Sequence, residues 1–118
     1  MAEFVIEVVN QPDGVVVVMR GPGDMLGTQL LEQKLLGLSA MRPARVVFDL
    51  AGLESISSIF MGALVRFRNG LVSQGRKVVL ARPQPLVLTA LKRAQLDRLM
   101  TITDSIEPFT APVPPPGH

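Results

Sequence analysis

Two adjacent serines, Ser57 and Ser58, lie where a polar stretch after Gly52 gives way to the long apolar run that begins at Ile59. The hydroxyl of a serine in such a place can act as a nucleophile, accept a phosphate, or cap the first turn of a helix. Capping needs no further function and contributes on the order of 1 kcal/mol. The pattern of residues alone leaves all these roles open.

A nucleophilic serine requires a base within hydrogen-bond reach, and the only histidine, His118, is the last residue of a proline-rich tail. No spacing singles out a Ser-Lys pair. The sequence also has no GxxxxGK[ST] phosphate loop, no GxGxxG and no cluster of His or carboxylate residues with metal-ligand spacing. We therefore expect a protein that is not an enzyme and that holds no metal or cofactor.

Composition narrows the class of protein further. The 118 residues include no cysteine, and 47% of them are hydrophobic, which predicts one globular domain without disulfides. The net charge is only +2 and the basic residues are scattered without stacking aromatics, so we expect no direct nucleic-acid partner. No apolar run approaches the roughly 20 residues that cross a bilayer, and no signal-peptide pattern is seen. These features predict a cytoplasmic protein without membrane insertion.

The elements that must position the serines follow from the apolar periodicity. Strands are predicted at residues 3–9, 14–20, 45–50, 77–81 and 100–103. Helices are predicted at residues 25–41, 58–74 and 86–99. An Asp-Gly pair between the first two strands favours a hairpin, and Asp24 is placed to cap the first helix or to contact a partner. Ser58 is thus expected at the start of the second helix.

Strands that alternate with helices imply parallel pairing with right-handed crossovers. Continuous apolar strands such as VVFDL imply a sheet covered by helices. We expect a single compact α/β domain over residues 1–106, with a mixed sheet of about five strands and helices packed against it. Residues 107–118 hold five prolines and are predicted to form a mobile C-terminal tail.

Leucines and phenylalanines at helical spacing predict which helix faces meet the core. In the first helix they are Leu26, Leu30, Leu31, Leu35 and Leu38, and in the second Phe60, Leu64, Phe67 and Leu71. Met61 and Val65 lie on the flank of the second stripe, where either the core edge or an exposed docking patch is possible. Asp49, near the end of a strand, is expected to brace the following loop rather than to mark a site edge.

The stretches GPGDM (21–25), VVFDLAGLESISSIFMGAL (46–64) and GRKVVLARPQPLVLTALKRAQLDRL (75–99), with the short final strand, resemble a STAS domain of the anti-sigma factor antagonist type. The resemblance covers residues 3–106. In that family the second helix starts with Asp-Ser-Ser-Gly-Leu-Gly or close to it, and an anti-sigma kinase phosphorylates the first serine. Here Ser58 stands at that serine and Gly62 at the second glycine. The acid, the small residue, the first glycine and the leucine are replaced by Ser57, Ile59, Phe60 and Met61.

The resemblance implies an anti-sigma factor antagonist that binds an anti-sigma factor serine kinase and thereby regulates sigma-factor-dependent transcription. Phosphorylation of Ser58, or alternatively Ser57, would switch binding off, and a phosphatase would reverse it. The implied docking surface comprises Asp24, Ser57, Ser58, Ile59 and Met61. A helix N-terminus tolerates a phosphate, whereas the added charge opposes an apolar partner.

The departures from the family motif leave a second interpretation open. In it the chain is a non-phosphorylated STAS subunit, which scaffolds a signalling complex or is attached to the ATPase of an ABC transporter.

Overall fold

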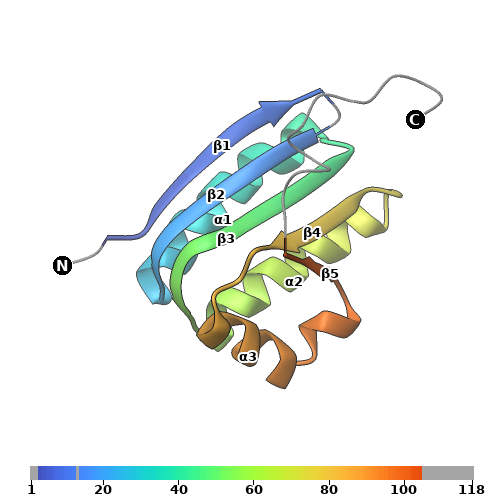
Figure 1. Ribbon diagram of the computed structural model, residues 1–118. Coiled ribbons are helices and arrows are strands. Elements are labelled where there is room, and N and C mark those ends of the chain that lie inside the picture. Colours follow the sequence, from blue (N-terminus) through green and yellow to red (C-terminus); the bar gives the residue numbers. More distant parts are fainter. Residues whose placement is uncertain (1–2, 13, 105–118) are drawn as a thin grey trace.

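The sheet of the computed structural model has its strands in the order β1-β2-β3-β4-β5 (Figure 1). The structure describes residues 3–12 and 14–104. The strands are β1 (Val5–Gln11), β2 (Gly14–Gly23), β3 (Arg45–Ile56), β4 (Lys77–Ala81) and β5 (Thr101–Thr103). The helices are α1 (Met25–Met41), α2 (Ser58–Val72) and α3 (Pro85–Arg93), followed by the 3-10 turn η1 (Leu96–Arg98). The predicted tail, residues 107–118, lies outside the described residues.

The sheet is mixed, as the order of elements predicts. β1 pairs with β2 antiparallel, while β2 with β3, β3 with β4 and β4 with β5 are parallel. The hairpin pairs Gln11 with Gly14, so the glycine of the predicted Asp-Gly pair is already the first residue of β2, and Asp13 is not among the described residues. The predicted α/β class with a five-stranded mixed sheet is confirmed.

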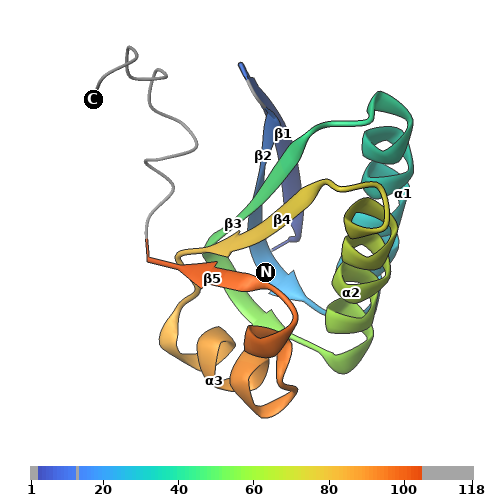
Figure 2. The same cartoon turned by 90° about the vertical axis from the view of Figure 1, so that its right-hand side faces the viewer.

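Helices α1 and α2 lie side by side on one face of the sheet, and α3 lies at the end of the sheet where β3 finishes (Figures 1 and 2). The main core fills the space between this face and the helices. Phe48 of β3 meets Phe67 of α2 edge to face, with ring centroids 5.8 Å apart. The stripe predicted for the second helix, Phe60, Leu64, Phe67 and Leu71, is buried in this core.

The leucine stripe of α1 is narrower than its periodicity predicts. Leu31, Leu35 and Leu38 are buried, but Leu26 and Leu30 are exposed by 65% and 38%. Gly27 and Thr28 take the inward positions of the first turn instead. A Cβ on Gly27 would lie 2.8 Å from the carbonyl oxygen of Pro22, so only glycine allows this close approach of helix and strand.

Several predicted boundaries are wrong: β1 and β2 run to Gln11 and Gly23 rather than ending at residues 9 and 20, and the larger differences concern β3 and the third helix. β3 does not end at residue 50 but continues to Ile56, because the end of β2 keeps pairing with it up to Gly23 opposite Ile56. The predicted helix 86–99 is interrupted after Arg93, where Gln95 adopts a left-handed conformation with φ 62° and η1 follows. Neither a long-range strand pairing nor a single left-handed residue produces a strong pattern in the local sequence.

Asp49 has a structural role, but not the predicted one of bracing the loop after its own strand: β3 continues to Ile56, and Asp49 instead holds the loop after β4. Its carboxylate, only 6% exposed, binds the guanidinium of Arg82 through Oδ2–Nη2 and Oδ1–Nε distances of 2.5 and 3.2 Å. The backbone N–H of Ala51 donates to Oδ1 over 3.1 Å. The hydrogen bonds that the Arg82 guanidinium donates to the Asp49 carboxylate raise the pKa of Arg82. Arg82 is thereby held in place, and its backbone N–H donates to the backbone carbonyl of Thr103 over 2.7 Å.

We expect Arg82→Met to lower the free energy of unfolding by on the order of 2 kcal/mol, because it leaves the buried carboxylate of Asp49 without its cation. The control is Arg66→Met, which removes an exposed ion pair with Glu32 and should cost less than about 1 kcal/mol. Urea denaturation of both variants measures the difference. Equal losses would show that the Asp49–Arg82 pair is no stronger than a surface contact.

Candidate partner-binding site

The site begins with the paired ends of β2 and β3. Gly23 lies opposite Ile56, and the backbone N–H of Ser57 donates to the carbonyl of Gly23 over 2.8 Å. A Cβ on Gly23 would lie 2.5 Å from the carbonyl oxygen of Ser55, so the strands could not approach this closely with any other residue. Since α1 and α2 each start directly after these strand ends, their N-termini lie next to each other.

Each of the two helices has a side-chain cap. Asp24 Oδ1 accepts a hydrogen bond from the N–H of Gly27 at 2.9 Å, which confirms Asp24 as the predicted N-cap of α1. In α2 the cap is Ser57, whose Oγ accepts from the N–H of Phe60 at 3.1 Å. The structure thus distinguishes the two serines by assigning capping to Ser57.

Ser58 is the first residue of α2 and its side chain is exposed. Within the described part of the chain its hydroxyl makes no hydrogen bond. The predicted position at a helix start is confirmed, and the interpretation of Ser58 as the cap is not. Its hydroxyl is left available to solvent beside the unpaired amides of the first helical turn.

A groove of about 480 Å³ runs between the start of α2 and α3. On the α2 side it is lined by Ser57, Ser58 and Met61, and on the α3 side chiefly by Leu86, Thr89 and Arg93. Met61 is half-buried and also packs against the main core, so it occupies both the core edge and the groove. The structure therefore places three of the five predicted docking residues along one groove.

The other two predicted residues lie beside the groove rather than in it. Ile59 is exposed by 51%, and Asp24 is exposed at the start of α1. Met25 and Leu26, which follow Asp24, are exposed by 62% and 65%. Large apolar side chains thus surround both helix starts, a pattern typical of a surface that binds another protein.

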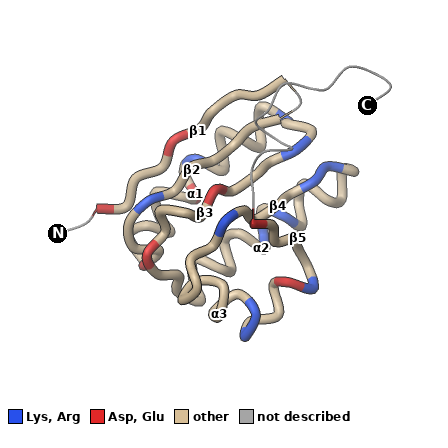
Figure 3. Tube along the Cα trace, in the orientation of Figure 1, with Lys and Arg blue, Asp and Glu red and all other residues tan. Residues whose placement is uncertain are grey.

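Sequence reasoning missed the contribution of α3. Leu86, the second residue of α3, is exposed by 70% and lines the groove, as does Arg93 at the other end of that helix. Arg93 is the only charged residue among the described residues that line the groove. Lys92 and Arg93 make the last turn of α3 basic, and Figure 3 shows blue at α3. A leucine next to a helix start was visible in the sequence, but its position opposite Ser58 depends on the fold.

The departures from the expected motif have different structural consequences. Phe60 is fully buried and its ring meets that of Phe4 edge to face, with centroids 5.6 Å apart. This bulky residue therefore leaves the surface unchanged. Ile59 does add apolar area to the surface, and Ser57 keeps a capping oxygen where the family has an acid.

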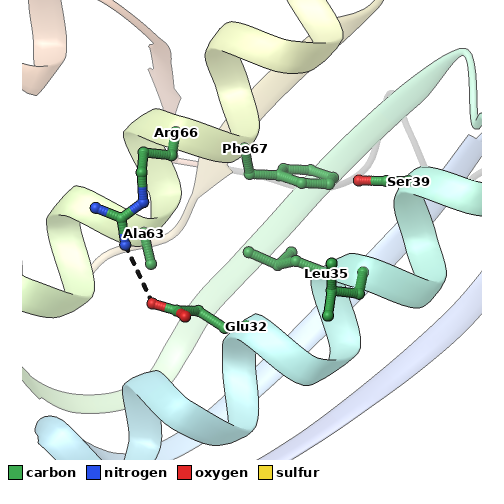
Figure 4. A pocket seen from close by; sticks show the side chains of 7 residues that line it. Glu32, Leu35, Ser39, Ala63, Arg66 and Phe67 are labelled. Atoms are coloured by element: carbon green, nitrogen blue, oxygen red, sulfur yellow. Dashed lines mark hydrogen bonds and ion pairs between the residues drawn. The ribbon is translucent and has the colours of Figure 1, made fainter.

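A second groove, of about 270 Å³, lies between α1 and α2 away from the predicted residues (Figure 4). Leu35 and Phe67 form its apolar floor, and an ion pair of Glu32 Oε1 with Arg66 Nη2, 3.1 Å long, spans it. Both charged side chains are more than half exposed, so this contact adds little stability. Nothing in the groove arranges a nucleophile with a base.

Over residues 3–12 and 14–104, no group of three or more His, Cys, Asp or Glu side chains is arranged to hold a metal ion. Among the helices described, none is both long and apolar enough to cross a bilayer. The expectations of no metal, no cofactor and no enzymatic activity stay predictions.

A family model for the STAS domain matches residues 5–108. The chain belongs to the STAS domain family. The match includes both caps, Ser58 and all of the described strands, so the family resemblance inferred from the sequence is confirmed.

Several solved structures have the same fold at low sequence identity. An anti-sigma factor antagonist from Mycobacterium paratuberculosis is 20% identical, with a TM-score of 0.84 and 90% of each chain covered. An anti-sigma-factor antagonist (STAS) domain protein from Planctomyces limnophilus is 21% identical, with a TM-score of 0.73 over 85% of this chain and 90% of that one. The phosphorylated Bacillus cell fate determinant SpoIIAA is 16% identical, with a TM-score of 0.68 over 90% and 96%.

The different roles of the two serines give a direct stability test. Ser57→Ala should lower the free energy of unfolding by about 1 kcal/mol, because it removes the oxygen that accepts from Phe60. Ser58→Ala removes no hydrogen bond of the described structure and should change stability by less than about 0.5 kcal/mol. Denaturant unfolding of the two variants provides the measurement. A larger loss for Ser58→Ala would mean that Ser58 is the cap after all.

Proposed function

We propose that this STAS protein is an anti-sigma factor antagonist. It binds an anti-sigma factor that is also a serine kinase, and binding releases the sigma factor for transcription. Phosphorylation of Ser58 ends the interaction and a phosphatase restores it. The protein acts in the cytoplasm as a binding partner and catalyses no reaction itself. Support comes from the STAS family model and from several structures of the same fold whose proteins are anti-sigma factor antagonists.

The observation that carries the proposal is the availability of Ser58. A phosphoacceptor must present its hydroxyl to a kinase without unfolding the helix that holds it. Ser58 is exposed at the first position of α2, while Ser57 supplies the cap. A phosphate on Ser58 would therefore leave the cap bond intact, whereas a phosphate on Ser57 would modify the capping oxygen itself. This favours Ser58 over the alternative, Ser57.

The fold around Ser58 suits a phosphate electrostatically. The first amides of α2 lack intrahelical partners, and the helix dipole is positive at this end. There is no acidic residue in the first turn of α2 to repel an added phosphate. Arg93 lines the same groove from α3 and supplies a positive charge. Phosphorylation should therefore change the charge of the surface rather than the fold.

The same charge would disrupt a partner that docks through apolar contacts. Ile59 and Leu86 expose 51% and 70% of their surfaces. Met61, which lines the groove, adds a further apolar side chain. A phosphate carries about −1.5 to −2 charges at neutral pH and would have to lose its water to stay under an apolar partner. The desolvation cost falls on the complex and not on the free protein. The switch thus acts on affinity.

The alternative function is a non-phosphorylated STAS subunit that scaffolds a signalling complex or is attached to the ATPase of an ABC transporter. The observation that favours it is the surface beside Ser58. Ser57 replaces the family's acid, and the exposed Ile59 replaces a small residue. A kinase that recognises the acid and the small residue at those positions would find neither of them here. Neighbouring genes separate the functions, since a kinase and a sigma factor support the first and transporter genes the second.

The effect of a negative charge at position 58 can be tested with Ser58→Asp. An acid in the first turn interacts favourably with the helix N-terminus by about 0.3 to 1 kcal/mol, so the melting temperature should hardly change. Affinity for the anti-sigma factor, identified by pull-down from the native cytosol, should fall by about tenfold or more, or about 1.4 kcal/mol. Calorimetry on Ser58→Asp and the wild type measures both the melting temperature and the affinity.

Ser58→Ala is the matched control for this variant, because it should bind like the wild type and resist phosphorylation by the kinase. If Ser58→Asp binds as tightly as the wild type, Ser58 is not the switch. Interaction with an ATPase of a transporter, unaffected by either substitution, would favour the alternative function.

The contribution of α3 has its own test. Leu86→Glu places a charge in the groove opposite Ser58 and should weaken binding to the anti-sigma factor by about tenfold or more. Leu36→Glu is the control, because Leu36 is equally exposed, by 74%, but lies on α1 beside the other groove. Titration calorimetry compares the two. Equal effects, or an effect of Leu36→Glu alone, would place the docking surface away from α3.

A further inference from the structure

The sheet carries a second apolar cluster, on the face that α1 and α2 do not cover. It consists of Val16, Val47, Val79 and Ala81, with Val18 partly buried against them. Neighbouring residues of the same strands, such as Val46 and Val78, belong to the main core instead. Because successive side chains of a strand point to opposite faces, the two clusters lie on opposite faces of the sheet.

No described helix lies over this second cluster. Figure 2 shows α1 and α2 together on the other side of the sheet, and α3 buries Val87 and Leu91 in the main core. Val16, Val47 and Val79 are nevertheless only 3%, 1% and 6% exposed. A sheet with one face in water normally alternates apolar and polar residues, whereas strands apolar on both faces belong to sheets covered on both sides. A second covering layer is therefore expected.

The strand register arranges this face as a row across the sheet. Val9 of β1 pairs with Val16 of β2, Val16 with Val47 of β3, Val47 with Val79 of β4, and Val79 with Thr101 of β5. The row is apolar from one edge strand to the other except at Thr101, where β5 begins. It offers a continuous strip for a segment that crosses the strands.

We propose that the occupant of this strip is the C-terminal segment of the same chain, residues 105–118. The described chain ends at residue 104, directly after β5, which is the edge strand beside Val79. Adjacent strands lie about 4.8 Å apart, so the path from β5 to β1 is about 19 Å. The 14 residues of the segment span about 43 Å when extended at 3.1 Å per residue. The segment is long enough to cross the whole strip.

The composition of the segment fits an apolar face without a strand ladder. It contains Ile106, Phe109 and Val113, and at neutral pH its only charged side chain is Glu107. Its five prolines have no N–H and a fixed φ, so they favour an extended segment that needs no hydrogen-bonded neighbour. Such a segment contacts a sheet face through side chains. It would shield the valines from a second copy of the chain, which is the competing occupant.

The absence of cysteine allows a single spin label to test this contact in the full-length protein. With the label on Ala111→Cys, methyl NMR should show the strongest broadening at Val47 and Val79, weaker broadening at Val46 and Val78, and the weakest at Leu31 on α1. A mobile tail, as the proline content alone predicts, would broaden no face selectively, and that result would overturn the proposal. Selective broadening of the α1 side would overturn it as well.

The two possible occupants are distinguished by mixing two samples. One is isotope-enriched and carries no spin label, and the other is spin-labelled and not isotope-enriched. Broadening should vanish in the mixture if the segment covers its own sheet. Broadening that persists would assign the strip to another copy and overturn the proposal. As a second check, Phe109→Asp should shift the methyl signals of Val47 and Val79 and lower the melting temperature, whereas the neighbouring Thr110→Asp should do so less. Equal effects of the two variants would also contradict it.

Discussion

The close pairing of the ends of β2 and β3 is the constraint on which the site depends. The carbonyl of Gly23 accepts the N–H of Ser57, and Gly23 has no Cβ that would meet Ser55. This contact is the last pairing of β2 with β3, and α2 starts directly after it. With it, two helix N-termini, two side-chain caps and several exposed apolar side chains are gathered at one end of the molecule.

Under the proposed function, this arrangement would let one pair of adjacent serines serve two purposes. Ser57 stabilises the start of α2 through Phe60, while the next hydroxyl, on Ser58, remains free for chemistry at the surface. A phosphate can be added there because the fold does not depend on that oxygen. The brace between Asp49 and Arg82 holds the loop that precedes α3, and with it the far wall of the groove. Under the proposed function, stability and regulation would thus depend on neighbouring but different atoms.

Much of this could be predicted from the sequence because the signals are local. Helix 25–41, strand 77–81 and the start of α2 at Ser58 agree with the structure, since each has a clear change of apolar period and a cap or turn residue at its end. Asp24 was recognisable as a cap for the same reason. The sequence did not show which of Ser57 and Ser58 is the cap of α2, because a shift of the helix start by one residue exchanges their roles.

The parts that were missed depend on distant contacts. The extension of β3 to Ile56 requires the end of β2 as a partner, and the break in the third helix requires one left-handed residue, Gln95. Leu86 and Arg93 could not be assigned to the site because only the crossover from β4 brings α3 to the start of α2. The alternating apolar residues on both faces were visible, but they were attributed to helices, which cover only one face.

The central claim, that Ser58 is a phosphorylation switch at a free helix start, is tested most directly by mapping the phosphate. The full-length protein is incubated with its anti-sigma factor kinase and ATP, and the modified residue is located by tandem mass spectrometry. We predict one phosphate, on Ser58, with a far-UV circular dichroism spectrum like that of the unmodified protein. A phosphate on Ser57, or a stable complex with the kinase that yields no phosphorylated protein, would contradict the account.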